Sequence, residues 1–298
     1  MESINEIFRN GLMQGCARLS PMSREAIASY ILSQEVATGG FRNKAGDVDL
    51  YYTFFGLMCA LCLGVKVRVE QHRTFIKQFD RKQLDLPHFV ASVQTTRLLH
   101  AFSTPEFLHR RGAGLASRFV PFGISRDLKQ LMNNSARVPV NDPHSPYSVF
   151  LAKIAVGAEK SDAQWHREQM PGYQTSSGGW SNIRGGTTPS LNATVSGMMI
   201  LRQMGRSANQ KTIEWLKEQQ HISGGFAAVQ GAPVPDLLST STALLALNAY
   251  NSAFRYPVKE FIQAHWRNNG GFAGTFADET TDCEYTLYGL LALGMSKK

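Results

Sequence analysis

Four Gly-Gly-aromatic triplets divide the chain at regular intervals. They are Gly39-Gly40-Phe41, Gly178-Gly179-Trp180, Gly224-Gly225-Phe226 and Gly270-Gly271-Phe272. The last three triplets begin 46 residues apart, and the first precedes the second by 139 residues, close to three such intervals. A fixed period of this length is typical of repeat architectures. We therefore predict six repeats of about 46 residues, two of them degenerate, within one domain spanning residues 1–298.

A second motif, ending in threonine, follows each triplet and precedes an apolar run. Its four clear copies are Asp49–Thr53, Ser190–Thr194, Asp236–Thr240 and Asp282–Thr286. We expect each aspartate to begin a helix, because its carboxylate can accept hydrogen bonds from the free amides of the first turn. The Gly-Gly pair is expected to end the preceding helix in the left-handed conformation. Segments starting at Asp85 and Asp142 are the expected counterparts in the two degenerate repeats.

Each repeat is predicted to be a helical hairpin. The segment before a triplet is amphipathic, as in 212–220, whereas the segment after the threonine is apolar nearly all round. Such hairpins must stack to bury their apolar faces. The pattern predicts an all-α protein with solvent-exposed outer helices and buried inner helices. It is compatible with both an open solenoid and a closed ring.

Composition and charge narrow the class of protein. Hydrophobic residues make up 43% of the chain and charged residues 18%, which excludes a disordered chain. The net charge of +8 suits an anionic ligand, nucleic acid or an acidic membrane surface. No basic helix, RNP-like strand or zinc finger is present, so we do not expect nucleic-acid binding.

The chain has neither a recognisable secretory signal nor a long apolar segment. Its longest apolar run, 53–65, is shorter than the ~20 residues that span a bilayer. We expect a cytoplasmic protein, with peripheral membrane contact left open. The four cysteines include Cys59 and Cys62 at CxxC spacing, but no second pair completes a zinc knuckle. We expect buried, reduced thiols.

The repeat resembles that of protein prenyltransferase β subunits and the related terpenoid cyclases. The resemblance rests on the triplet followed by Asp-x-x-(Ser/Tyr)-Thr, and it covers about residues 20–296. The last repeat, 270–289, and the tripeptide Asp142-Pro143-His144 are most similar to Rab geranylgeranyltransferase β subunits. The resemblance implies an α6/α6 toroid (barrel) of six helical hairpins, with a central apolar cavity for an isoprenoid chain. One fold hosts several chemistries, so the reaction must be argued from the site.

The zinc ligands of protein prenyltransferases are not all matched. The family's Asp, Cys and His correspond here to Asp236, Leu238 and Tyr285. One carboxylate alone does not hold zinc, so we expect no zinc and no other cofactor. The loop 227–235 also lacks the family's diphosphate-binding cations. Arg42, Lys44 and Arg184, in the turns of other repeats, are the candidate replacements.

The resemblance to class II terpenoid cyclases suggests a proton donor. In that family the middle acid of a D-x-D-D-T motif protonates an alkene, and the equivalent positions here include Tyr51, Asn192, Leu238 and Glu284. Glu284 is the one acid among them, and burial can keep a carboxylic acid protonated. Candidate catalytic residues are Glu284, Asp282 and Asp236, and candidate substrate contacts are Tyr51, Tyr52, Phe55, Asn192, Leu238, Tyr285, Tyr288, Arg42, Lys44 and Arg184.

A structural interpretation competes at each of these positions. The repeated aspartates suit helix N-caps, Glu284 suits the first turn of a helix, and the triplet aromatics suit packing within hairpins. The aromatic residues that begin the inner helices are better placed to line a cavity and to stabilise carbocations.

Three functions fit the sequence. The first is a zinc-independent isoprenoid enzyme, either prenyltransferase-like or a compact cyclase with a carboxylic acid as proton donor. The second is a true prenyltransferase β subunit with a helical α-subunit partner. The third is a non-catalytic isoprenoid-binding or scaffold protein.

Overall fold

The computed structural model describes residues 3–103, 124–135, 142–156 and 168–296. The helices within these ranges are α1 (Ile4–Ala17), α2 (Pro21–Gln34), α3 (Leu50–Leu63), α4 (Val69–Ile76), α5 (Leu86–Phe102), α7 (Ile124–Ser135), α8 (Pro146–Val156), α10 (Leu191–Gln203), α11 (Gln210–Glu218), α12 (Leu237–Ala249), α13 (Lys259–Ala264) and α14 (Cys283–Met295). Two short 3₁₀ helices, η1 (Arg81–Gln83) and η2 (Met170–Tyr173), lie between them. Two antiparallel pairs, β1 (Phe41–Arg42) with β2 (Val48–Asp49) and β3 (Phe272–Ala273) with β4 (Thr281–Asp282), complete the described elements.

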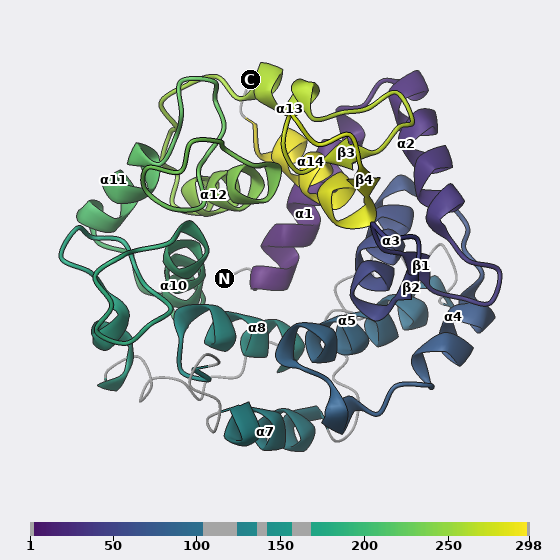
Figure 1. The fold of residues 1–298 in the computed structure, drawn as a ribbon, viewed down its shortest axis with the longest axis horizontal. Helices are drawn as coiled ribbons and strands as arrows, with labels where there is room; N and C mark the ends of the chain where they lie inside the picture. Colours follow the sequence, from purple (N-terminus) through teal and green to yellow (C-terminus); the bar gives the residue numbers. More distant parts are fainter. Residues whose placement is uncertain (1–2, 104–123, 136–141, 157–167, 297–298) are drawn as a thin grey trace.

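Six helices form a closed inner ring. In the order α3, α5, α8, α10, α12 and α14, each contacts the next, and α14 contacts α3. Helices α2, α4, α7, α11 and α13 surround this ring (Figure 1). The outer segment of the fourth repeat lies outside the described residues. Because α14 contacts α3, the repeats form a closed ring and not an open solenoid. The predicted all-α toroid is therefore confirmed.

In the four repeats that carry a triplet, its first glycine lies against the backbone of the following repeat. A Cβ on Gly39 would lie 2.3 Å from the carbonyl oxygen of Gln71 in α4, and one on Gly224 would lie 2.1 Å from that of Pro257, just before α13. Gly270, in the last repeat, makes the same approach to Ala26 in α2 of the first, at 2.3 Å. The backbone approach that holds neighbouring repeats together therefore also closes the ring.

The Gly-Gly pair does not end the preceding helix, contrary to the prediction. Helix α2 ends at Gln34, and a turn follows in which Glu35 and Phe41 form a β-bridge around Gly39 and Gly40. Both glycines of this triplet have positive φ, 97° and 85°, whereas in the other three triplets only the first glycine does. The predicted left-handed conformation is confirmed for the first glycine of each triplet, where it makes the turn that the neighbouring repeat approaches.

The threonine motif fixes the triplet aromatic onto the inner helix. The Phe272 amide donates to Thr286 Oγ1 at 3.1 Å, and the Thr286 hydroxyl donates to the Asp282 carbonyl at 2.6 Å. The same pair of bonds occurs in the first, fourth and fifth repeats. The four triplet aromatics are at most 2% exposed, which confirms their predicted packing within the hairpins.

Four of the five predicted aspartate caps are confirmed, and Ser190 caps α10. Asp49, Asp236 and Asp282 accept from amides three residues ahead, and so does Asp85 in the second repeat. In the third repeat Asp142 is not the cap. Ser145 instead accepts from the Ser148 amide at 3.2 Å, and α8 begins at Pro146. Proline favours the first helical position, which places the cap at the residue before it.

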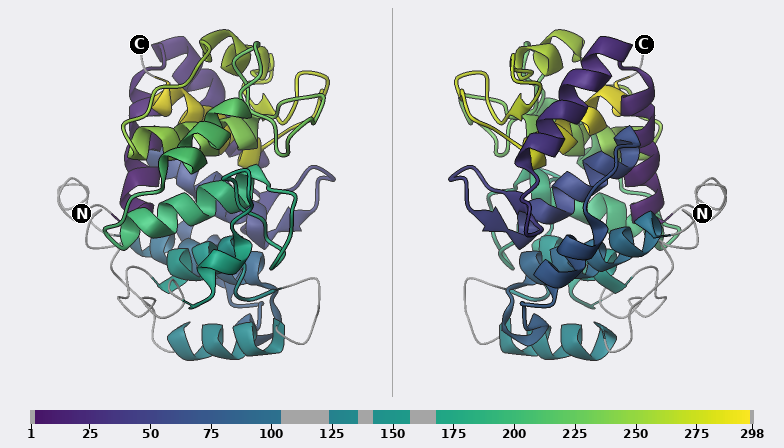
Figure 2. Two further views of the ribbon diagram at one scale, coloured as in Figure 1. Left: turned by 90° about the vertical axis from the view of Figure 1, so that its left-hand side faces the viewer. Right: turned by 90° about the vertical axis from the view of Figure 1, so that its right-hand side faces the viewer.

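Helix α1 lies across the end of the ring at which the inner helices finish. A Cβ on Gly15 would lie 1.9 Å from the Leu290 carbonyl oxygen in the C-terminal half of α14. Asn5 Nδ2 donates to the Ile154 carbonyl near the end of α8, at 3.3 Å. The hairpin loops project from the opposite end (Figure 2). We call that opposite end, where the inner helices begin, the mouth of the toroid.

Arginines bind the last carbonyls of four inner helices. Arg24 Nη2 donates to Leu63 in α3 at 2.8 Å, Arg97 Nη1 to Ile154 in α8 at 3.0 Å, and Arg202 Nη1 to Ala249 in α12 at 2.6 Å. Arg18 binds carbonyls at the end of α14. Cations are favourable at helix C-termini, so part of the positive charge has a structural role. All four cysteines are buried and free, as predicted. No helix among the described residues is both long and apolar enough to span a membrane.

Candidate functional site

The closed ring brings Tyr51 and Glu284 together at the mouth. Tyr51 lies in the first turn of α3 and Glu284 in the first turn of α14, 233 residues later in the chain. The Tyr51 hydroxyl donates to Glu284 Oε1 at 2.8 Å. Glu284 is only 9% exposed. The contact between the first and last repeats therefore contains a buried carboxyl group.

Aromatic side chains surround this carboxyl group. The Tyr51 ring packs edge-on against Phe55, with 4.8 Å between centroids, and Phe55 lies 6.0 Å from the Tyr288 ring. Tyr52 packs against Tyr51 at 5.8 Å. Four of the predicted substrate contacts, Tyr51, Tyr52, Phe55 and Tyr288, thus gather at one place. Their faces offer the electron density that stabilises cations.

Burial gives Glu284 a proton near neutral pH. Loss of hydration raises the pKa of its carboxyl from the ordinary 4.5 to about 7. The hydrogen bond from Tyr51 and the charge of Lys44 act in the opposite direction, and the charge of Asp282 adds to the rise. At neutral pH the group is therefore near its titration midpoint, where general acids work best.

Asp282, two residues earlier, is both a helix cap and a buried charge. Its Oδ1 accepts from the Tyr285 amide at 2.7 Å. Its Oδ2 is buried, and no donor among the described residues hydrogen-bonds it. The Lys44 ammonium lies 3.7 Å from that oxygen and 2.8 Å from Asp278 Oδ2. Burial raises the pKa of Asp282 to about 6, and Lys44 partly offsets this.

The other predicted residues lie elsewhere on the rim. Asp236 Oδ1 accepts from the Ser239 amide and its Oδ2 from the Ser239 hydroxyl, as in a structural cap. Leu238 follows it in α12, and Asn192 is exposed at the start of α10, where it bonds Asn182. Arg42 donates to Gly46 within its own hairpin, and Arg184 donates to Gln169. These cations do not converge on Glu284, and their predicted ligand roles stay predictions.

Tyr147 is a site residue that the sequence analysis missed. It begins α8, on the opposite side of the inner ring from α14 (Figure 1). After burial, the nearby Glu284 carboxylate is the main cause that raises the pKa of the Tyr147 phenol. Tyr147 follows the Ser145 cap by two residues, as Tyr51 follows Asp49 and Glu284 follows Asp282. This spacing from the cap could have identified Tyr147 in the sequence. It was missed because the cap was predicted at Asp142 and not at Ser145.

The zinc ligands of protein prenyltransferases do not fit here. Both oxygens of Asp236 already accept from Ser239, and the other two positions are Leu238 and Tyr285. Within the ranges that the structure describes, no three histidine, cysteine or acidic residues form a group that could hold a metal.

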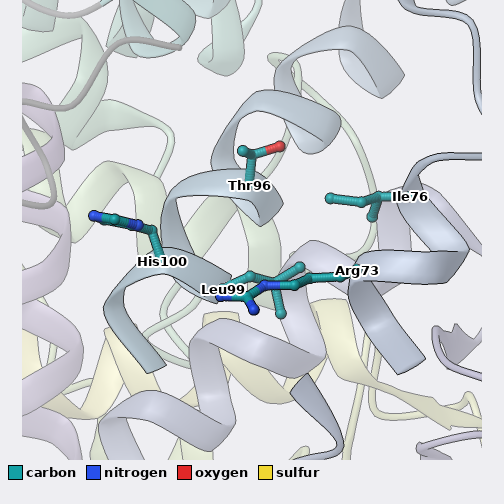
Figure 3. Close-up of a pocket in the computed structure, with 5 residues that line it drawn as sticks. All are labelled: Arg73, Ile76, Thr96, Leu99 and His100. Atoms are coloured by element: carbon teal, nitrogen blue, oxygen red, sulfur yellow. The ribbon is translucent and has the colours of Figure 1, made fainter. Parts of the chain in front are cut away.

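A pocket between α4 and α5 is separate from this site. It has a volume of about 150 Å³ and is lined by Arg73, Ile76, Thr96, Leu99 and His100 (Figure 3). None of the predicted site residues lines it, so it does not serve the Tyr51–Glu284 pair.

The fold and the site define a helical toroid with an acidic and aromatic mouth. The family model of the prenyltransferase alpha-alpha toroid domain matches residues 10–102 and 188–298. These two segments make up more than half of the chain, so the chain belongs to this family. The stretch between them holds α7 and α8 of the third repeat, whereas α4 and α5 of the second repeat lie within the first matched segment. No curated protein that was compared with the chain matches it.

Proposed function

We propose that this protein is an isoprenoid-processing enzyme in which Glu284 protonates an alkene of a polyprenyl substrate. The observation that carries the proposal is the buried Glu284 carboxyl beside the Tyr51 hydroxyl, with a pKa of about 7. An acid with this pKa is near its titration midpoint at neutral pH, so a substantial fraction of the protein carries the proton that the reaction needs.

The proposed protonation and ring closure need no metal ion. The Glu284 proton and the π electrons of the terminal alkene form a C–H bond, which leaves a cation on the more substituted carbon. The next alkene of the chain attacks that cation and closes a ring. The final cation loses a proton to a base, and Glu284 recovers one from solvent. The product is therefore an isomer of the substrate.

The aromatic residues supply the second requirement of this chemistry. Tyr51, Phe55 and Tyr288 lie in contact beside the acid, so a cation formed there would face their rings. Each such contact contributes roughly 0.5–2 kcal/mol when water is excluded. The π faces of these rings would stabilise the cation, and the burial that keeps water from the site raises the pKa of Glu284.

The test is incubation of the purified protein with squalene and with C15 and C20 prenyl diphosphates, followed by mass spectrometry. We expect a cyclised product of unchanged mass, and we expect Glu284→Gln to lower its yield by roughly 10²–10⁴-fold. Glu279→Gln is the matched control, because Glu279 is an exposed acid in the loop before α14. An unchanged yield in Glu284→Gln would overturn the proposed role of this acid.

Metal analysis of the same preparation distinguishes the alternatives. Stoichiometric zinc, together with prenyl transfer to a cysteine-containing peptide in the presence of a helical partner, would replace the proposal with a prenyltransferase β subunit. Binding of the isoprenoid with no product of either kind would indicate a non-catalytic isoprenoid-binding protein.

A further inference from the structure

Lys44 connects the first repeat to the acidic pair of the last. It lies at the tip of the β1–β2 hairpin, which Asn43 Oδ1 orders by accepting from the Ala45 and Asp47 amides at 2.9 and 3.0 Å. From there Lys44 reaches Asp278 at 2.8 Å and Asp282 at 3.7 Å. Its ammonium also stands 4.8 Å from the centroid of the Tyr285 ring. Three contacts thus hold this cation at one edge of the mouth.

The buried carboxyls of Asp282, which caps α14, and of Glu284, in its first turn, have different neighbours. Asp282 has Lys44 beside an oxygen that receives no hydrogen bond from the described residues. Glu284 has the neutral Tyr51 hydroxyl and aromatic rings. The charge of Asp282 raises the pKa of Glu284, so ionisation of one carboxyl disfavours ionisation of the other. A cation beside one of them therefore favours ionisation of that one.

We propose that Lys44 is a positioning residue that keeps the negative charge of this pair on Asp282 and leaves the transferable proton on Glu284. The inference rests on the proposed function for the use of that proton, but the location of the proton can be measured without turnover. The Lys44 side chain is 35% exposed. Its charge lowers the pKa of both Asp282 and Glu284. Because its ammonium pairs with Asp282 at 3.7 Å, we expect the larger effect on Asp282.

Other ionisable groups also face the pair and are accounted for in the test. They are Tyr51, Tyr52 and Cys59 of α3, Tyr147 of α8, Cys283, Tyr285 and Tyr288 of α14, Tyr30 of α2, and Asp49, Asp236 and Asp278 of the mouth loops. The phenols and thiols are neutral near pH 7, because burial raises the pKa of each of them further. The nearest ionised neighbours of Lys44 are therefore Asp278 and Asp282.

Asp278 competes with Asp282 for the same ammonium. It is more exposed than Asp282, and its contact with Lys44 is shorter. Removing the charge of Asp278 should strengthen the ion pair between Lys44 and Asp282 and lower the pKa of Asp282. Removing Lys44 should abolish that ion pair and raise the pKa. The two substitutions therefore act on Asp282 in opposite directions, which a merely structural role for Lys44 would not produce.

The experiment is a ¹³C NMR titration of the full chain with labelled aspartate side chains, in which Asp282→Asn assigns the Asp282 signal. We expect Lys44→Met to raise the Asp282 midpoint by about one pH unit, because a cation within about 4–6 Å shifts a carboxyl by that order. Asp278→Asn should lower it, and Lys44→Arg should retain the wild-type value. Lys66→Met, an exposed lysine on another loop, is the control and should change nothing.

An Asp282 midpoint that is unchanged in Lys44→Met, or that moves in the same direction in Asp278→Asn, would overturn the inference. Circular dichroism of each variant checks that the fold is retained. If the wild-type protein cyclises no isoprenoid, the proposed function fails, and the titration still decides the role of Lys44.

Discussion

Tyr51 and Glu284 are joined by a 2.8 Å hydrogen bond, although one belongs to the first repeat and the other to the last. The bond exists because α14 packs against α3 and closes the ring. The candidate acid is therefore assembled by the tertiary closure of the fold, and no local segment contains it.

The bond makes a prediction for the acidity of Glu284. Tyr51→Phe removes a donor to the carboxylate, so we expect the pKa of Glu284 to rise above about 7. A hydrogen bond to a charged group contributes roughly 1.5–3 kcal/mol, which corresponds to at least about one pH unit. A ¹³C titration of labelled glutamate side chains measures it. Tyr52→Phe is the control, and an equal change in both variants would contradict a specific role for Tyr51.

Protein stability should depend on pH through the same carboxyl. The pKa of Glu284 is about 7 in the folded protein against an ordinary 4.5. The folded state thus binds this proton more tightly than the unfolded state does. Proton binding at Glu284 therefore stabilises the folded protein fully below pH 4.5, and this stabilisation is lost as the pH rises through 7. Relative to wild type, we expect Glu284→Gln to gain about 1–3 kcal/mol of unfolding free energy between pH 4 and pH 8. Urea unfolding at both pH values measures this difference, and a gain that does not depend on pH would contradict it.

The fold was predictable because its determinants are local and repeated. The triplets and the motif threonines recur at the same spacing, and each threonine accepts from the amide of its triplet aromatic in all four clear repeats. Ring closure was not predictable from the period. It depends on whether Gly270 meets Ala26 in the first repeat, which is a tertiary contact that no window of sequence contains.

The site was predicted only in part, for a physical reason. Glu284, Tyr51 and Tyr288 could be selected because each lies in the first two turns of an inner helix, just after a recognisable aspartate cap. Tyr147 could not, because Asp142 precedes Pro143 as a cap would, while the true cap is a serine. The significance of Lys44 depends on its contacts with Asp282 and with the competing Asp278, which is 234 residues away in the chain. Sequence spacing gives no information about these contacts.

The conserved geometry of the threonine motif can be tested in the fifth repeat. Thr240→Val removes the acceptor for the Phe226 amide, which is buried beneath the hairpin turn. Leaving a buried donor unsatisfied costs about 1–3 kcal/mol of unfolding free energy. Thr240→Ser should recover most of that loss, because the hydroxyl is restored. Thr242→Val is the control, since its hydroxyl bonds only carbonyls of its own helix. Equal losses from Thr240→Val and Thr242→Val in urea unfolding would contradict this role.

The contact between α1 and α14 depends on the absence of side chains. A Cβ on Gly15 would meet the Leu290 carbonyl oxygen at 1.9 Å, and one on Gly294 would meet the Gly11 carbonyl oxygen at the same distance. Backbone atoms on both sides cannot move as a flexible side chain can. Gly15→Ala must therefore separate the two helices, although alanine favours a helix in itself.

We expect Gly15→Ala to lower the unfolding free energy by about 1–3 kcal/mol, as overpacking in a core does. Hydrogen exchange should speed up in α1 while the amides of α10 and α12 stay protected, because the inner ring closes without α1. Gln14→Ala, at an exposed position of the same helix, is the control and should be neutral or slightly stabilising. Uniformly faster exchange throughout the ring would instead mean that α1 is required for closure itself.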